Sequence, residues 1–272
     1  MSGNDDEGRR AYASVIVVGG GCYGGYYVRQ LDRAVAAGAL EIERVVVVDH
    51  DRDCAVAGTL ATLEAPRHAP VELRIAEWSE FFDEYLSDAA ERPAAHADDA
   101  IVPSPLMPHL MAEWLIARAR ARAAGRSVAV EPFDTLPDVP WERAGHDATH
   151  YVSFATWTCP INCVEPRICP HTRGPRSWSM PVALRDYAKR EASGGHDVEV
   201  AVLHCRHRSY GVGMFDTREV LDADERIAAA AERGPAEAVI GTVSHCHGAL
   251  TRVLIGGLRV GGLRAEAGSR DR

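Results

Sequence analysis

The stretch that decides the fold lies near the N-terminus, where Ser14-Val-Ile-Val-Val18 runs directly into Gly19-Gly-Gly-Cys-Tyr-Gly-Gly25. The first segment is continuously apolar and β-branched, as strands buried in parallel sheets are. From residue 26 to 37 the apolar residues recur with helical spacing. The sequence therefore predicts a strand, a tight glycine turn and a helix, in that order.

The glycines of this turn have the spacing Gly-x-Gly-x-x-Gly, and an acidic residue ends the next predicted strand at 44–49. Such glycines let the chain turn tightly and let a pyrophosphate reach the N–H groups at the helix N-terminus. The acid accepts hydrogen bonds from an adenosine ribose and favours NAD over NADP. We therefore expect NAD(H) binding, while another adenosine ligand or a turn without a ligand stays open. The expected binding residues are Gly19, Gly21, Gly24 and Asp49.

Strand and helix patterns alternate through the first 130 residues, which predicts an α/β fold with a doubly wound parallel sheet. Over residues 13–130 the chain resembles the Rossmann NAD(P)-binding superfamily. It is similar to compact members such as precorrin-2 dehydrogenases and the nucleotide-binding domains that regulate potassium transporters. The resemblance implies dinucleotide binding at the glycine turn. The predicted strands are 14–18, 44–49, 71–75, 100–102 and 127–130, and the predicted helices are 26–37, 54–63, 78–86 and 108–124.

Five of the seven cysteines lie after residue 158. Cys159, Cys163 and Cys169 are close in sequence on a chain stiffened by prolines, whereas Cys205 and Cys246 follow predicted strands at 198–203 and 238–243. If these two strands are parallel neighbours, both thiols emerge at one sheet edge, where the first three can fold over them. Clustered cysteines in an intracellular protein indicate metal or redox chemistry.

An iron–sulfur centre, with a 4Fe-4S cluster favoured, is the first expectation for these cysteines, because cysteine followed by proline is typical of ferredoxins. Zinc is the alternative, although its structural sites usually show two close ligand pairs. A set of redox thiols without metal is a third interpretation. Cys205 or Cys246 is expected to supply the fourth ligand, ahead of His171, His245 and His247.

The predicted domain organisation is a disordered tail at 1–12, a dinucleotide-binding domain at 13–145 and a Cys/His-rich, metal-binding α/β domain at 146–265. The second domain is assigned to no family. Asp216 and Glu219 form a capping-box pattern that predicts a helix reaching about residue 233. No catalytic residue is assigned. His109, which follows a proline-rich loop after the fourth predicted strand, is a candidate for acid–base chemistry, and the alternative is an ordinary residue of a helix's first turn. His150 is the other candidate.

The net charge of −9 argues against a broad electrostatic contact with nucleic acid or anionic lipid. No apolar run is long enough to cross a membrane, and the first ten residues do not resemble a secretion signal. We expect a cytoplasmic protein without nucleic-acid or membrane partners. A redox partner protein and a homo-oligomer stay open.

The leading hypothesis is an NAD(H)-binding redox protein with an iron–sulfur centre, acting as an oxidoreductase or an electron-transfer subunit. A nicotinamide transfers a hydride and a cluster takes single electrons, so a two-electron relay on a partner is needed. A non-catalytic, redox-sensing regulatory subunit with a structural zinc or iron–sulfur site is the alternative. The third hypothesis is a chelatase or metal-handling protein. In it, a transient ion is held by His204, His207, His245 and His247.

Overall fold

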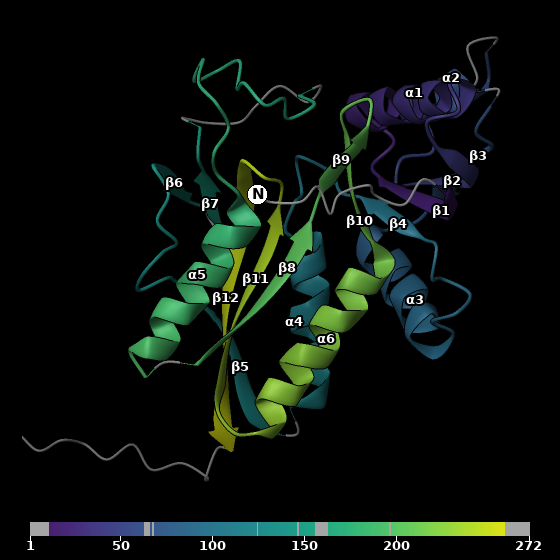
Figure 1. Cartoon of the computed structure of the whole chain (residues 1–272). Coiled ribbons are helices and arrows are strands. Elements are labelled where there is room, and N and C mark those ends of the chain that lie inside the picture. Colours follow the sequence, from purple (N-terminus) through teal and green to yellow (C-terminus); the bar gives the residue numbers. More distant parts are fainter. Residues whose placement is uncertain are drawn as a thin grey trace, which may run out of the picture.

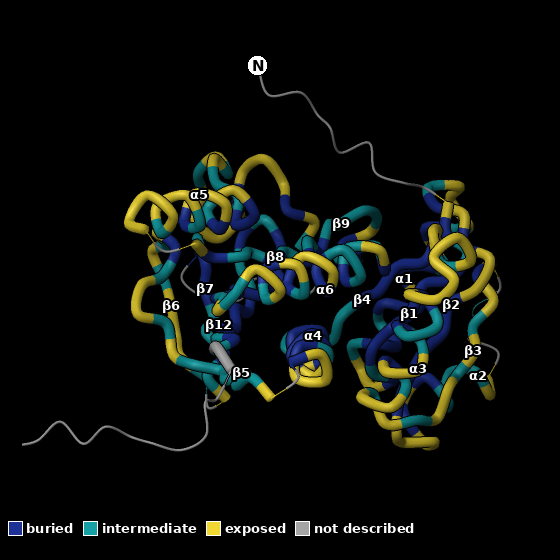
Figure 2. The backbone as a smooth tube through the Cα atoms, turned by 90° about the horizontal axis from the view of Figure 1, so that it is seen from below, coloured by how far each residue is buried: buried dark blue, intermediate teal, exposed yellow. Residues whose placement is uncertain are grey.

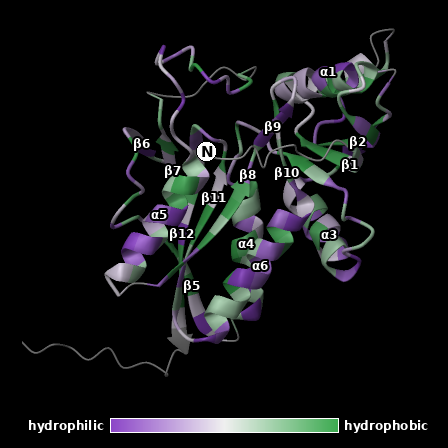
Figure 3. Ribbon diagram, in the orientation of Figure 1, coloured by the Kyte–Doolittle hydropathy of each residue, from purple (hydrophilic) through white to green (hydrophobic). Residues whose placement is uncertain are grey.

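The computed structural model describes residues 11–62, 66, 68–123, 125–145, 147–155, 163–195 and 197–258. These residues form two mixed β-sheets with helices on their faces (Figure 1). Hydrophobic residues concentrate in the strands, whereas α5 and α6 carry many hydrophilic residues (Figure 3). Within the described part of the chain, no helix is both long and apolar enough to cross a membrane.

The first sheet has the order β3-β2-β1-β4-β10-β9. Its first four strands are mutually parallel, β10 runs antiparallel to β4, and β9 runs antiparallel to β10. The expectation of a wholly parallel sheet therefore holds for four strands only, and the fold is mixed α/β. The strands are β1 (Ala11–Val18), β2 (Glu41–Asp49), β3 (Val71–Ile75), β4 (Ala100–Val102), β9 (Arg206–Ser209) and β10 (Val212–Asp216).

The second sheet has the order β6-β7-β12-β11-β8, and β5 also pairs with β12. β8 and β11 are parallel neighbours, which meets the condition stated for Cys205 and Cys246, and the other pairings are antiparallel. The strand expected at 127–130 forms, but it belongs to this sheet because it pairs with β12. The strands are β5 (Arg126–Glu131), β6 (Trp141–Ala144), β7 (His150–Ser153), β8 (Val198–His204), β11 (Ala236–Val243) and β12 (His247–Leu258).

One layer of helices lies between the two sheets (Figure 2). Phe82, Leu115 and Ile227 from three helices share a hydrophobic core with Ile101 of the first sheet and Ile240 of the second. The three helices of this layer are α3 (Trp78–Glu91), α4 (Leu110–Arg122) and α6 (Thr217–Glu232). The outer faces of the sheets are covered by α1 (Cys22–Ala36) and α2 (Ala55–Leu60) on the first and by α5 (Met180–Ser193) on the second.

Strand pairing crosses the expected division at residue 145. The first sheet takes β9 and β10 from the second half, and the second sheet takes β5 and β6 from the first half. The two domain ranges stay a prediction, but neither half completes its own sheet. The expected tail at 1–12 is too long, because Ala11 and Tyr12 belong to β1 and Tyr12 is buried.

Candidate functional site

The glycine turn joins the end of β1 to the start of α1. Gly19 has a positive φ of 87°, which favours glycine. A Cβ on Gly24 would lie 1.9 Å from the carbonyl oxygen of Gly19, so only glycine fits there. Gly21 is the N-cap of α1, has no side-chain cap, and faces open space. The turn therefore brings a helix N-terminus, with its unpaired N–H groups, close to the end of β1.

Asp49 is buried behind this turn at the end of β2. One carboxylate oxygen accepts a hydrogen bond from the backbone N–H of Gly20 at 2.6 Å, and the other accepts one from Asp51 at 2.8 Å. Asp49 thus holds the turn in place, a role that the sequence did not indicate. Because each carboxylate oxygen has two lone pairs, acceptor capacity remains for a ribose hydroxyl.

The described part of the cysteine-rich loop, from residue 163 onward, contacts the chain just after the ends of β8 and β11. The Glu165 carboxylate accepts a hydrogen bond from the N–H of His245 at 3.1 Å, and the Trp178 indole donates to the Cys246 sulfur at 3.3 Å. The His207 imidazole lies 2.5 Å from the carbonyl oxygen of Cys163. These contacts gather a group that we call the strand-end cluster: Cys163, Glu165, His204, His207, His245, Cys246 and His247.

Two imidazoles of this cluster, those of His204 and His247, are kept neutral by burial. The His204 and His245 rings meet edge to face, with centroids 4.6 Å apart. Burial, with a smaller contribution from the charge of Arg206, lowers the pKa of His204 to about 3. Burial also lowers the pKa of His247, although Glu165 opposes the shift. His204 Nε2 and His247 Nδ1 are buried without a hydrogen-bond partner in the structure. Both nitrogens therefore have an unused bonding position inside the protein.

The sequence-predicted cysteines are only partly brought together. Cys205 packs in the core between the sheets, and burial raises the pKa of its thiol well above the ordinary value. Burial raises the pKa of Cys246 too, with the Trp178 hydrogen bond opposing it and Cys163 adding to it. Cys159 lies outside the described residues.

Cys169 sits in a separate turn with His171. Burial raises the pKa of the Cys169 thiol, but N–H donors of Thr172 and His171 and the charge of Arg176 outweigh it and lower the pKa overall. Among the described residues, no three side chains of His, Cys, Asp or Glu are close enough together to hold a metal ion. The expected ligand set of Cys159, Cys163, Cys169, Cys205 and Cys246 therefore stays a prediction.

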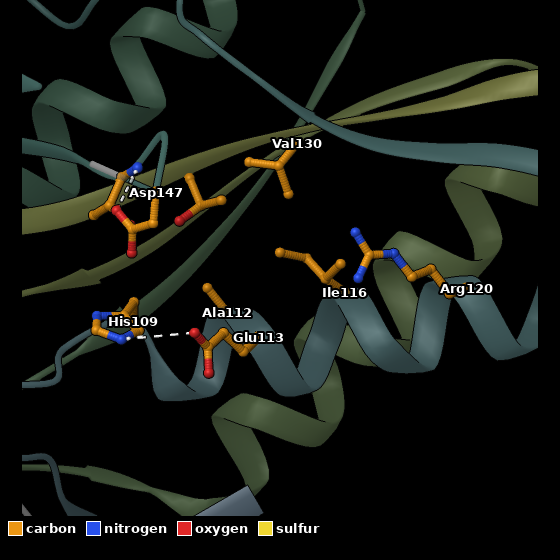
Figure 4. Close-up of a pocket in the computed structure, with 9 residues that line it drawn as sticks. His109, Ala112, Glu113, Ile116, Arg120, Val130 and Asp147 are labelled. Atoms are coloured by element: carbon orange, nitrogen blue, oxygen red, sulfur yellow. Dashed lines mark hydrogen bonds and ion pairs between the residues drawn. The ribbon is translucent and has the colours of Figure 1, made fainter. Parts of the chain in front are cut away.

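His109 lies at the N-cap of α4 and lines a cavity of about 350 Å³, which we call the α4 cavity (Figure 4). The sequence reasoning named His109 but missed the polar residues that join it there. A usable signal existed, because His109, Glu113 and Arg120 are spaced four and seven residues apart and share one helix face. The full lining is His109, Ala112, Glu113, Ile116, Arg120, Val130, Asp147, Thr149 and Thr251.

A family model named AF_1314_C, described as "Uncharacterized protein, C-terminal domain", matches residues 111–256, which is more than half of the chain. The chain belongs to the AF_1314_C family. The part that matches the AF_1314_C model includes the whole strand-end cluster and every lining residue of the α4 cavity except His109. The glycine turn lies before it. No curated protein and no solved structure matches the chain.

Proposed function

We propose that the protein binds an adenine dinucleotide, NAD(H), at the glycine turn. The observation that carries the proposal is the packing of Gly24 against the carbonyl of Gly19, with a glycine at 21 facing open space. This is the arrangement that dinucleotide-binding turns need: one glycine for close helix–strand packing and another for approach of the pyrophosphate. The N–H groups at the start of α1 would then bind the phosphates.

Two features of the first sheet support the same ligand. The parallel strands have the order β3-β2-β1-β4, which is the first part of the order found in Rossmann folds. Helices α1 and α3 cover opposite faces of these strands, as a doubly wound sheet requires. Asp49, at the end of β2, is placed for the ribose, and its negative charge favours NAD over NADP.

The strand-end cluster supports a second ligand, a transition-metal ion. Neutral imidazoles and thiolates are the ligands that zinc and similar ions take from proteins. His204 Nε2 and His247 Nδ1 are buried and unpartnered, so a metal bond would replace a missing hydrogen bond. The cluster holds more imidazoles than thiols, which favours a single ion over the expected 4Fe-4S cluster. Metal binding requires a rearrangement, because no three donors are in place in the described residues.

The function that combines both ligands is that of an NAD(H)-binding redox protein, an oxidoreductase or an electron-transfer subunit. If the metal is redox-inert, the regulatory alternative is favoured instead, with NAD(H) reporting the redox state. If the ion exchanges readily, the metal-handling alternative is favoured.

Calorimetric titration with NADH tests the first ligand, using Gly21→Ala and Gly58→Ala as a matched pair. Both glycines face open space, so both variants are expected to fold, but only position 21 lies on the proposed phosphate site. We expect Gly21→Ala to bind NADH at least tenfold more weakly and Gly58→Ala to bind it like the original protein. Absence of NADH binding by the unaltered protein, or unchanged binding by Gly21→Ala, would refute the proposal.

Metal analysis tests the second ligand, on protein purified without oxygen. We expect stoichiometric zinc or another single ion, lost in a His204→Ala, His247→Ala double variant. About four irons with matching sulfide would instead restore the iron–sulfur expectation. Metal-free protein that takes up no zinc, iron or copper on titration would overturn the metal site without affecting the NADH result.

A further inference from the structure

The α4 cavity lies between α4 and the second sheet, in a part of the molecule that the proposed NAD(H) and metal sites do not use. Its lining comes from α4, β5, β12 and the loop between β6 and β7. Figure 4 shows His109, Glu113 and Asp147 at one end of the cavity and Arg120 at the other. The two ends therefore carry opposite charges.

The cationic end is the guanidinium of Arg120. Three arginines follow one another at alternate positions of α4, and two of them, Arg118 and Arg122, form ion pairs with the buried Asp224. Arg120 forms no ion pair with any described residue and extends toward the cavity (Figure 4). A guanidinium presents several donors in a planar fork that fits a carboxylate. Arg120 is thus the one α4 arginine of these three that is free for an anionic ligand.

The anionic end holds two carboxylates around an imidazole. His109 Nε2 lies 3.6 Å from a Glu113 carboxylate oxygen, and His109 Nδ1 is buried without a hydrogen-bond partner. Asp147 is fixed by an N–H donor from Thr149 at 3.1 Å. Burial raises the pKa of Asp147, but the Thr149 hydrogen bonds and His109 outweigh it and keep the group ionised. This end suits an ammonium group, which donates three hydrogen bonds.

Apolar side chains separate the two ends. Ala112, Ile116 and Val130 line the middle of the cavity. Glu113 and Arg120 are seven residues apart on one helix, which sets their backbone positions roughly 10 Å apart along its axis. Both side chains line the cavity while remaining exposed to solvent. A ligand whose charges are separated by about six bonds spans the gap between them.

We propose that the α4 cavity binds a small zwitterion with an ammonium group and a carboxylate at opposite ends of a short aliphatic chain, the class of ω-amino acids. The carboxylate pairs with Arg120, the ammonium lies among Glu113, Asp147 and His109, and the methylenes contact Ile116 and Val130. The proposal does not depend on NAD(H) or metal binding.

Titration with 6-aminohexanoate tests the site, with hexanoate and hexylamine as probes that each lack one charge. We expect 6-aminohexanoate to bind at least tenfold more tightly than either. Arg120→Gln is expected to remove this preference over hexylamine, whereas Arg185→Gln, an exposed arginine on α5 across the second sheet, leaves it intact. Equal binding of the three probes, or no binding of any, would overturn the proposal.

A charge exchange distinguishes loss of a contact from loss of the fold. Arg120→Glu turns the cationic end anionic, so this variant is expected to prefer 1,6-diaminohexane over 6-aminohexanoate by tenfold or more. A gain of binding cannot come from misfolding. If Arg120→Glu keeps the original preference, Arg120 does not face the ligand and the assignment of the cavity is wrong.

Discussion

Among single residues, Gly24 carries the clearest steric requirement. Gly24→Ala would place a methyl group 1.9 Å from the backbone oxygen of Gly19, which cannot move without opening the turn. We expect a loss of more than about 2 kcal/mol in the free energy of unfolding, measured by urea denaturation. The neighbouring Gly25→Ala is the control, because its Cβ would meet only the Arg29 side chain at 3.5 Å. Similar losses in both variants would contradict this account.

The sequence identifies residues whose role depends on their immediate neighbours, and misses those whose partners are distant. Gly19, Gly21, Gly24 and Asp49 could be selected because strand, turn and helix follow one another. The partners of Glu165 could not, because the loop reaches His245 only after β8 and β11 have paired. Cysteine spacing led to the expectation of a thiolate cluster, because spacing shows only which residues are near one another along the chain. The direction of side chains at the strand ends cannot be predicted from spacing.

At the scale of elements, α4 and α6 are joined by one buried acid. The Asp224 carboxylate contacts Arg122 at 2.6 Å and Arg118 at 3.4 Å. Asp224→Asn leaves two guanidinium groups without their counter-charge, but Arg122 is 41% exposed and regains hydration. We therefore expect the free energy of unfolding to fall by about 1–3 kcal/mol, which is less than the full cost of breaking a buried ion pair.

Chemical denaturation of Asp224→Asn beside Asp222→Asn provides the comparison. Asp222 lies on the same helix in an exposed contact with Arg218, so its substitution should change stability by less than about 0.5 kcal/mol. If the two variants unfold at the same urea concentration, the ion pairs of Asp224 contribute nothing to the stability of the fold.

The helix with a local capping signal was predicted, whereas two strands that form hairpins with the strands directly before them were missed. The helix at α6 begins at Asp216 with both hydrogen bonds of the capping box, as the pattern indicated. β12 was missed because its glycines read as loop. Gly248 is needed there, because a Cβ would lie 2.3 Å from the Val243 side chain. β10 was missed as well, because its short hairpin with β9 contains Gly211 and Gly213, which indicated a flexible connection.

At the scale of the whole molecule, the two sheets are held together by a helical layer that draws on both halves of the chain. α3 and α4 precede the expected boundary and α6 follows it, and all three share one core. Polar contacts reinforce this layer near Tyr85. Its hydroxyl lies 3.0 Å from an Asp99 carboxylate oxygen and 2.8 Å from the Thr217 hydroxyl, which connects α3, β4 and α6.

The contacts of Tyr85 predict that the fold loses stability at alkaline pH. Burial raises the pKa of Tyr85, the Asp99 charge adds to it, and the Thr217 hydrogen bond only partly opposes it. The folded protein therefore keeps the phenol proton above about pH 10, where an unfolded tyrosine loses it. By linkage, the stabilisation from Tyr85 is complete below that pH and is lost as the pH rises through and beyond it.

Tyr85→Phe isolates this contribution. Near neutral pH the variant should be less stable by about 1–2 kcal/mol, because the Asp99 and Thr217 hydrogen bonds are lost. At about pH 11 the difference from the unaltered protein should shrink, since ionisation now destabilises the tyrosine protein but not the variant. Urea denaturation at both pH values measures this difference in stability. Tyr210→Phe, in the exposed turn between β9 and β10, is the control. A stability difference that is the same at both pH values would mean that the fold does not raise the pKa of Tyr85.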